Sequence, residues 1–144
     1  MRIMIDTNVV ISAILKQGSV PDIVLNDVYE NHELILCDHI ISESYEVTKR
    51  RFPGRVDVLD NLFAKLRYEL VPAPRTGEIL IRDIKDQPIL SAAIAYGVDV
   101  LIIGDKHFLG LGLETPQIMT PFEYKEQYMI LLRKPFRSRG GYPI

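Results

Sequence analysis

Short apolar runs alternate with longer amphipathic segments along the chain. The runs Arg2–Ile5 and Val98–Ile103 are brief and mostly apolar, a pattern typical of strands buried inside a sheet. The stretches His32–Cys37, Leu70–Val71 and Gln117–Met119 predict three further strands. The sequence therefore predicts several short strands separated by longer segments.

Those longer segments carry apolar residues at helical spacing. Asn8 is expected to cap the first helix, and Gly97 is expected to end an apolar helix that Asp86 and Pro88 open. The predicted helices are Val9–Leu15, a segment with Pro21 in its first turn, a segment from Asp38 to Arg51, Arg55–Glu69, a segment from Gln87 to Gly97, and a segment from Pro121 to about Leu132. Strands that alternate with helices predict an α/β fold with a mostly parallel central sheet.

Length and charge narrow the class of protein. The 144 residues are expected to form one domain over residues 1–132, followed by a basic, flexible tail over residues 133–144. Hydrophobic residues make up 47% of the chain and charged residues 25%, an ordinary globular profile. The formal net charge of −2 argues against a protein that holds nucleic acid through overall positive charge.

Several kinds of chemistry lack support in the sequence. The single cysteine, Cys37, excludes an intrachain disulfide and a cysteine-based zinc site. The histidines His32, His39 and His107 lack zinc-ligand spacing, and no GxGxxG, GxxxxGK[ST] or GxSxG motif follows a predicted strand. The first residues do not resemble a signal peptide, and no apolar run approaches the roughly 20 residues that span a bilayer. We therefore expect a cytoplasmic protein with no membrane partner.

Four acidic residues fall where a parallel sheet forms its sites. Asp6 directly follows the first strand, and Asp105 follows the Val98–Ile103 strand after one glycine. Asp86 opens the helix that leads to that strand, and Glu43 lies in the helix after the second strand. Sites in open parallel sheets form outside the carboxyl ends of the strands, so these four acids are expected to converge.

Each acid taken singly has a structural interpretation as a helix cap, a turn residue or a solvated helix residue. A cluster is different, because neighbouring carboxylates repel one another unless a cation neutralises them. Oxygen-only ligands suit Mg²⁺ or Mn²⁺ rather than zinc. Such an ion activates water and stabilises charge on a phosphoryl group, which indicates phosphodiester chemistry.

Three stretches, IDTNVVISAIL, RDIKDQPILSAAIAYGVDVLIIGDKHFLGL and IMTPFEY, resemble the PIN domain family of metal-dependent nucleases. The resemblance runs from Arg2 to about Tyr128 and implies a three-layer α/β/α sandwich. The implied site consists of a metal-binding acidic quartet and a supporting polar residue: Asp6, Glu43, Asp86 and Asp105, with Asn8. Between the signatures the match rests on pattern alone, so Glu46 rivals Glu43 and Asp83 rivals Asp86.

The function implied by this resemblance is Mg²⁺- or Mn²⁺-dependent cleavage of single-stranded RNA by the toxin of a toxin–antitoxin pair. Stand-alone members of the family are commonly homodimers inhibited by an antitoxin that covers the acidic pocket. An acidic site repels RNA, so basic residues are expected to bind backbone phosphates, namely Lys16, Arg50, Arg51 and Lys106. The apolar residues of Val20–Tyr29 are candidates either for a dimer face or for the core.

Two positions depart from the family pattern and keep other interpretations open. Ile103 and His107 stand where the family often has a hydroxyl residue and a second acid. These departures give weight to an alternative, a non-catalytic PIN-like module that binds nucleic acid or protein. A phosphatase or nucleotidase that uses the same acids on small substrates is a further alternative.

Overall fold

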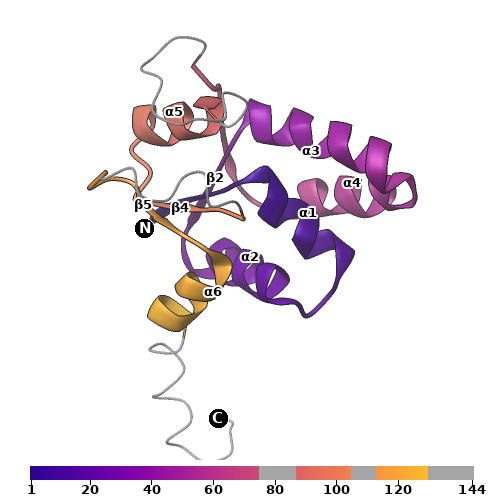
Figure 1. Ribbon diagram of the computed structural model, residues 1–144, viewed down its shortest axis with the longest axis horizontal. Helices are drawn as coiled ribbons and strands as arrows, with labels where there is room; N and C mark the ends of the chain where they lie inside the picture. Colours follow the sequence, from indigo (N-terminus) through magenta and orange to yellow (C-terminus); the bar gives the residue numbers. More distant parts are fainter. Residues whose placement is uncertain (75–86, 105–112, 130–144) are drawn as a thin grey trace, which may run out of the picture.

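The computed structural model describes residues 1–74, 87–104 and 113–129. The strands in these ranges form one sheet with the order β3-β2-β1-β4-β5 (Figure 1). They are β1 (Arg2–Ile5), β2 (Glu33–Cys37), β3 (Glu69–Val71), β4 (Val100–Ile102) and β5 (Gln117–Met119). Each of their pairings is parallel, which confirms the predicted α/β fold with a parallel sheet.

Helices cover both faces of this sheet. In Figure 1, α3 and α5 lie on one side of the strands and α2 and α6 lie on the other. The helical elements are α1 (Thr7–Leu15), α2 (Val20–Asn31), α3 (Asp38–Arg51), η1 (Pro53–Arg55), α4 (Val56–Lys65), α5 (Gln87–Ala95), α6 (Pro121–Tyr124) and η3 (Lys125–Met129). The three-layer α/β/α arrangement is therefore confirmed.

The central strand of the sheet is β1. Met4 pairs with Ile35 of β2 on one side and with Leu101 of β4 on the other. Ile3, Met4 and Ile5 are all fully buried, although successive side chains of a strand point to opposite faces. This is the burial expected of a parallel strand covered by helices on both faces. The strand therefore carries the residue that follows it to the carboxyl edge, near the middle of the sheet.

The end of α5 shows why β4 is shorter than the predicted Val98–Ile103 strand. The N–H of Val98 donates to the carbonyl of Ala93, so this residue belongs to the turn that closes the helix. Gly97 adopts a φ of +67°, the left-handed conformation that ends many helices and that glycine adopts without a Cβ penalty. The predicted helix stop at this glycine is confirmed.

The helix predicted over Arg55–Glu69 is too long at its C-terminal end. The observed α4 ends at Lys65, and Leu66 has an extended backbone with a ψ of 139°. Leu66 is buried, and the residues after it lead into the edge strand β3. The helical spacing of apolar residues in the sequence therefore extends beyond the end of the observed helix, where the chain turns towards β3.

The early helices lie in the interior rather than on an exposed apolar face. Within α2, Val24, Leu25 and Val28 are buried and belong to the main hydrophobic cluster. Val20, Ile23 and Tyr29 are half-buried against this cluster, so the structure supports the core for the buried residues, and the dimer face stays a prediction. No single helix in the described ranges is long and apolar enough to cross a membrane; α1 and α2 meet those criteria only as a pair bent by 112°.

The final helix is less regular than the sequence pattern predicts. Thr120 caps α6 through a capping box with Glu123, since each side chain accepts from the other residue's backbone N–H. After one turn the chain continues as the π-helical segment η3. The predicted end near Leu132 and the basic tail over 133–144 lie outside the described residues.

Candidate active site

Asp6 lies at the carboxyl end of the central strand and is only 3% exposed. Its backbone N–H donates to the carbonyl of Ile102 at the end of β4, which ties it to the neighbouring strand. A buried carboxylate loses hydration and must be compensated by hydrogen bonds or by positive charge. The surroundings of Asp6 therefore matter more than those of an exposed acid.

The first compensation comes from α1, which Asp6 itself caps. Its Oδ1 accepts from the N–H of Val9 at 3.0 Å, and its backbone is extended, with a φ of −78° and a ψ of 169°. The prediction that Asn8 caps this helix is therefore wrong; Asn8 lies inside the first turn and is exposed. The helix begins directly after β1 with no intervening loop, so the cap position falls on the first residue after the strand.

The second compensation comes from the segment after β4. The N–H of Gly104 lies 3.3 Å from Oδ1 and 3.2 Å from Oδ2 of Asp6. Gly104 also packs closely on α1, because a Cβ at this position would stand 3.1 Å from the Cβ of Asn8. Backbone donors from two elements thus hold the Asp6 carboxylate in place.

The carboxylate of Glu43 reaches the same end of α1 from α3. The hydroxyl of Thr7 donates to Oε1 of Glu43 at 2.6 Å. His39, one helical turn earlier, places its Nε2 3.8 Å from the same oxygen. Thr7 directly follows Asp6, so Glu43 is hydrogen-bonded to the residue next to an acid that lies 37 positions earlier in the sequence.

Glu46, the alternative to Glu43 in the predicted quartet, is more exposed and has a different partner. Its side chain is 73% exposed and pairs with Arg50 at 3.5 Å, whereas the side chain of Glu43 is 26% exposed. The structure therefore brings Glu43, and not Glu46, to the residues around Asp6.

The remaining acids of the predicted quartet, Asp86 and Asp105, lie outside the described residues, as do the rival Asp83, Lys106 and His107. Within residues 1–74, 87–104 and 113–129, no group of three or more His, Cys, Asp or Glu side chains is arranged to hold a metal. The described chain reaches Gly104, in hydrogen-bond contact with Asp6, one residue before Asp105. Half of the predicted quartet is therefore visible at this edge.

The chemistry of the two visible acids fits a hard divalent cation. Both offer carboxylate oxygens, and Oε2 of Glu43 has no hydrogen bond to any described residue. The thiol of Cys37 ends the neighbouring strand β2, but burial raises its pKa to about 11, so it is a neutral group rather than a thiolate ligand. Oxygen ligands without sulfur suit Mg²⁺ or Mn²⁺.

Three residues at this edge escaped the sequence prediction: Thr7, Gly104 and His39. A threonine after an aspartate has an ordinary role at a helix start, and a glycine before an aspartate indicates only a turn. The position of His39 carried a usable signal, since it lies four residues before Glu43 on a predicted helix and therefore on the same face.

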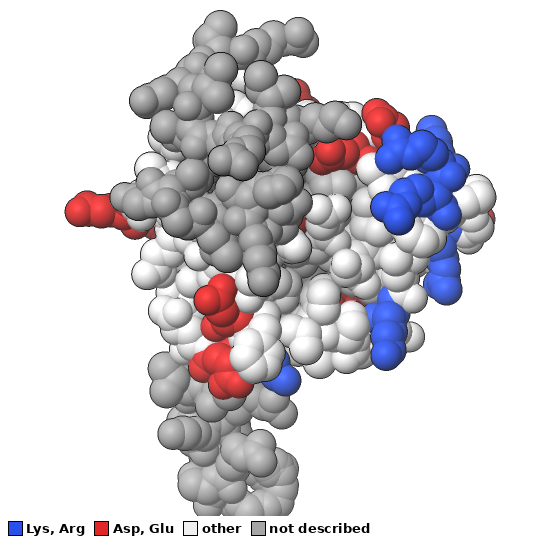
Figure 2. Space-filling view, in the orientation of Figure 1, with Lys and Arg blue, Asp and Glu red and all other residues white. Residues whose placement is uncertain are grey.

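Basic side chains gather beyond Glu43, at the C-terminal end of α3. Figure 2 shows Lys and Arg side chains over the region where α3 ends and α4 begins. The basic residues there include Lys49, Arg50 and Arg51 in the last turn of α3, followed by Arg55. Glu43 and Arg50 are two helical turns apart, roughly 10 Å along the axis. Lys16, at the C-cap of α1, is exposed.

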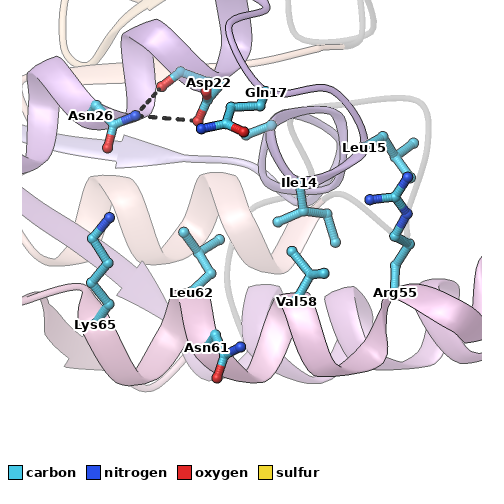
Figure 3. Close-up of a pocket in the computed structure, with 11 residues that line it drawn as sticks. Ile14, Leu15, Gln17, Asp22, Asn26, Arg55, Val58, Asn61, Leu62 and Lys65 are labelled. Atoms are coloured by element: carbon cyan, nitrogen blue, oxygen red, sulfur yellow. Dashed lines mark hydrogen bonds between the residues drawn. The ribbon is translucent and has the colours of Figure 1, made fainter.

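A groove of about 440 Å³, lined by both apolar and polar side chains, lies between α1, α2 and α4, near the C-terminal end of α1. Figure 3 shows Ile14 of α1 opposite Val58 and Leu62 of α4. Arg55 and Lys65 flank these apolar residues along α4. The groove and Asp6 lie at opposite ends of α1, so the groove is distinct from the acidic edge.

Comparisons with known proteins agree with this geometry. The family model described as the PIN domain matches residues 2–107. None of the curated proteins matches the chain in sequence.

Solved structures that share the fold of this chain include the following two. A chain of the VapBC2 structure from Rickettsia felis, bound to a promoter DNA fragment, is 20% identical, with a TM-score of 0.60 over 83% of this chain and 97% of that one. VapC20 of Mycobacterium tuberculosis, a toxin that cleaves the sarcin–ricin loop, is 14% identical, with a TM-score of 0.55 over 78% of this chain and 98% of that one.

Proposed function

This chain belongs to the PIN domain family, and we propose that it is a Mg²⁺- or Mn²⁺-dependent endoribonuclease. The observation that carries the proposal is that Glu43 of α3 accepts a hydrogen bond from Thr7, the residue next to Asp6, at the carboxyl edge of the sheet. Glu43 forms no ion pair with lysine or arginine in the part of the chain that the structure describes. A carboxylate without such a partner is suited to help bind a divalent cation.

The acids have distinct proposed roles. Asp6, Asp86 and Asp105 would hold the ion, and Glu43 would bind a second ion or orient the attacking water. Asn8 would support the site from the first turn of α1. When bound, the ion would lower the pKa of its water and stabilise charge on the phosphoryl group. In-line attack on phosphorus by a water that Glu43 orients would break the P–O3′ bond and leave a 3′-hydroxyl and a 5′-phosphate.

Basic residues are proposed to bring RNA to this acidic edge. Arg50 and Arg51 lie two helical turns from Glu43 on the same helix, and Lys16 ends α1. Together with Lys106 they would bind backbone phosphates, which requires no sequence recognition. Binding through phosphates predicts affinity that falls as salt rises.

We extend the proposal to the toxin of a toxin–antitoxin pair, a homodimer inhibited by a protein antitoxin. The support is the likeness in fold to VapC20, described as a cleaving toxin, and to a chain of the VapBC2 structure. The groove between α1, α2 and α4, where Ile14, Val58 and Leu62 lie among polar side chains, is the surface that we propose for a partner. Growth arrest on expression of wild type, relieved by co-expression of a neighbouring small reading frame, tests this role.

Cleavage of a mixed RNA pool with Mg²⁺, Mn²⁺ or EDTA tests the enzymatic proposal. Wild type is compared with Asp6→Asn, since asparagine caps helices about as well as aspartate and keeps α1 intact. The matched control is Asp57→Asn, an exposed acid in the first turn of α4. We expect metal-dependent cleavage by wild type and the control, and none by Asp6→Asn. Cleavage at the wild-type rate by Asp6→Asn would refute the acidic site.

The non-catalytic alternative has one specific observation in its favour. Ile103 is fully buried, and its N–H bonds to the carbonyl of Met119, so it brings no hydroxyl group to the site. RNA binding without cleavage under any metal condition would favour this alternative. Hydrolysis of p-nitrophenyl phosphate without cleavage of an RNA oligonucleotide would instead favour a phosphatase.

A further inference from the structure

The hydrogen bond from Thr7 to Glu43 has the features of a strong, shielded contact. Its length of 2.6 Å falls in the range of charge-assisted O–H···O⁻ bonds. Thr7 is only 4% exposed, so water does not compete freely for its hydroxyl. Its β-branched side chain has few rotamers, and it sits in the first turn of a helix that Asp6 caps. Thr7 is therefore a rigid donor next to the proposed metal ligand.

Glu43 by itself would not be rigid. A glutamate side chain on a partly exposed helix face has three rotatable bonds and loses considerable entropy when held in one geometry. Thr7 donates to Oε1, and His39 approaches that same oxygen. The second oxygen, Oε2, has no hydrogen bond within the described part of the chain. The contact therefore fixes the carboxylate through one oxygen and leaves the other for an ion or a water.

We propose that Thr7 is a positioning residue that acts through Glu43, presenting Oε2 to the ion or to the attacking water. This inference rests on the proposed nuclease function, because it assigns Thr7 a role at the same site. Thr7 does not touch substrate in this role. The effect of removing its hydroxyl should resemble that of removing a residue that orients a metal ligand, which is about 10- to 100-fold in affinity or rate.

A structural role has to be separated from a positioning role, because the same bond also joins α1 to α3. The chain offers a matched control in Thr48, a buried threonine of α3 whose hydroxyl has no hydrogen-bond partner among the described residues. Thr7→Val and Thr48→Val make the same nearly isosteric change. Thr7→Ser keeps the hydroxyl and should rescue the function. Thermal unfolding of each variant reports the structural contribution separately.

Two readouts are compared on the full-length protein: Mn²⁺ binding by electron paramagnetic resonance, and RNA cleavage resolved into kcat and KM. For Thr7→Val we expect about 10-fold weaker Mn²⁺ binding and a kcat lower by about 10- to 100-fold. The KM should stay unchanged, since RNA is held by basic residues elsewhere. Thr7→Ser and Thr48→Val should match wild type in both readouts.

A double-mutant cycle with Glu43→Ala tests the route of the effect. If Thr7 acts only through Glu43, Thr7→Val should add nothing in the Glu43→Ala background. Wild-type Mn²⁺ binding and kcat in Thr7→Val, or a full additional loss in the double variant, would overturn the inference while the nuclease proposal stands. Cleavage by Asp6→Asn at the wild-type rate, or no metal-dependent activity in wild type, would refute the proposed function and this inference with it.

Discussion

The backbone N–H of Gly104 lies within 3.3 Å of both carboxylate oxygens of Asp6, a residue 98 positions earlier in the chain. This contact links the ends of β1 and β4, two adjacent strands of the sheet. A backbone N–H can donate whatever side chain its residue carries. At this position, however, the close approach to α1 favours a residue without a side chain. Gly104 approaches α1 so closely that a methyl group would meet Asn8.

Gly104→Ala should therefore disturb the Asp6 carboxylate. The new Cβ would stand 3.1 Å from that of Asn8, and crowding of this kind typically costs about 1–3 kcal/mol of unfolding free energy. We expect a lower urea midpoint and slower metal-dependent cleavage. Gly54→Ala is the control, since no described atom lies within 4 Å of a Cβ there. Equal behaviour of the two variants would show that the close approach at Gly104 has no consequence.

Neutralising the basic end of α3 should weaken RNA binding without affecting the acidic edge. Arg50 and Arg51 are exposed, and removal of one phosphate-binding cation should make the slope of log affinity against log salt shallower by about 0.7 for single-stranded RNA. The double Arg50→Gln, Arg51→Gln variant removes two cations, so we expect its slope to be shallower by about 1.4, with a higher KM and kcat retained. Arg67→Gln, which removes a cation stacked on Tyr29 elsewhere, is the control. An unchanged salt slope in the double variant would place RNA on another surface.

Stability should decrease in alkaline solution because of Cys37. Burial raises the pKa of its thiol to about 11 in the folded protein, whereas the ordinary value is 9.0. Between these values the unfolded chain releases the proton first, so the free energy of unfolding falls as pH rises from about 9 to 11, by at most roughly 3 kcal/mol. The pKa of Tyr45 is raised from 10.0 to about 12, chiefly by its hydrogen bond to Asp60, so its contribution to stability is lost between about pH 10 and 12 and overlaps that of Cys37.

Urea unfolding at several pH values tests this expectation. Cys37→Ala should be less stable than wild type near neutral pH, because it leaves a small cavity among buried residues. Its loss of stability between about pH 9 and 11 should nevertheless be smaller than that of wild type. Parallel curves for the two proteins would exclude the thiol as the titrating group.

Tyr124 should stabilise the contact between α6 and α2. Its buried hydroxyl donates to Oδ2 of Asp27 at 2.7 Å, and Tyr124→Phe should cost about 1–3 kcal/mol because the acceptor is charged. Tyr128→Phe removes a similar bond, to Gln117 at 3.1 Å, but an exposed one between neutral groups. We expect it to cost less. A larger loss of urea stability in Tyr128→Phe than in Tyr124→Phe would contradict this ranking.

Local sequence patterns were sufficient to specify the order of the elements and the class of fold. Apolar runs flanked by breakers located β1 and β5 at their observed residues, and Gly97 was recognised as a helix stop from its neighbours in the chain. These features depend on side-chain burial and backbone freedom, which a short window contains. The same patterns placed Asp6 and Glu43 after the first and second strands. The positions of Asp86 and Asp105 stay predictions.

Contacts between distant segments settled the features that local patterns left open. The choice of Asp6 over Asn8 as cap follows from the direct passage of β1 into α1, and the choice of Glu43 over Glu46 follows from the way α3 packs on α1. The hydrogen bond from Thr7 to Glu43 depends on the packing of α1 against α3, which a local pattern does not contain. Helical periodicity specifies which residues share a face, but it does not specify what that face will contact. A single hydroxyl or N–H across such a contact decides which of several similar acids is held in place.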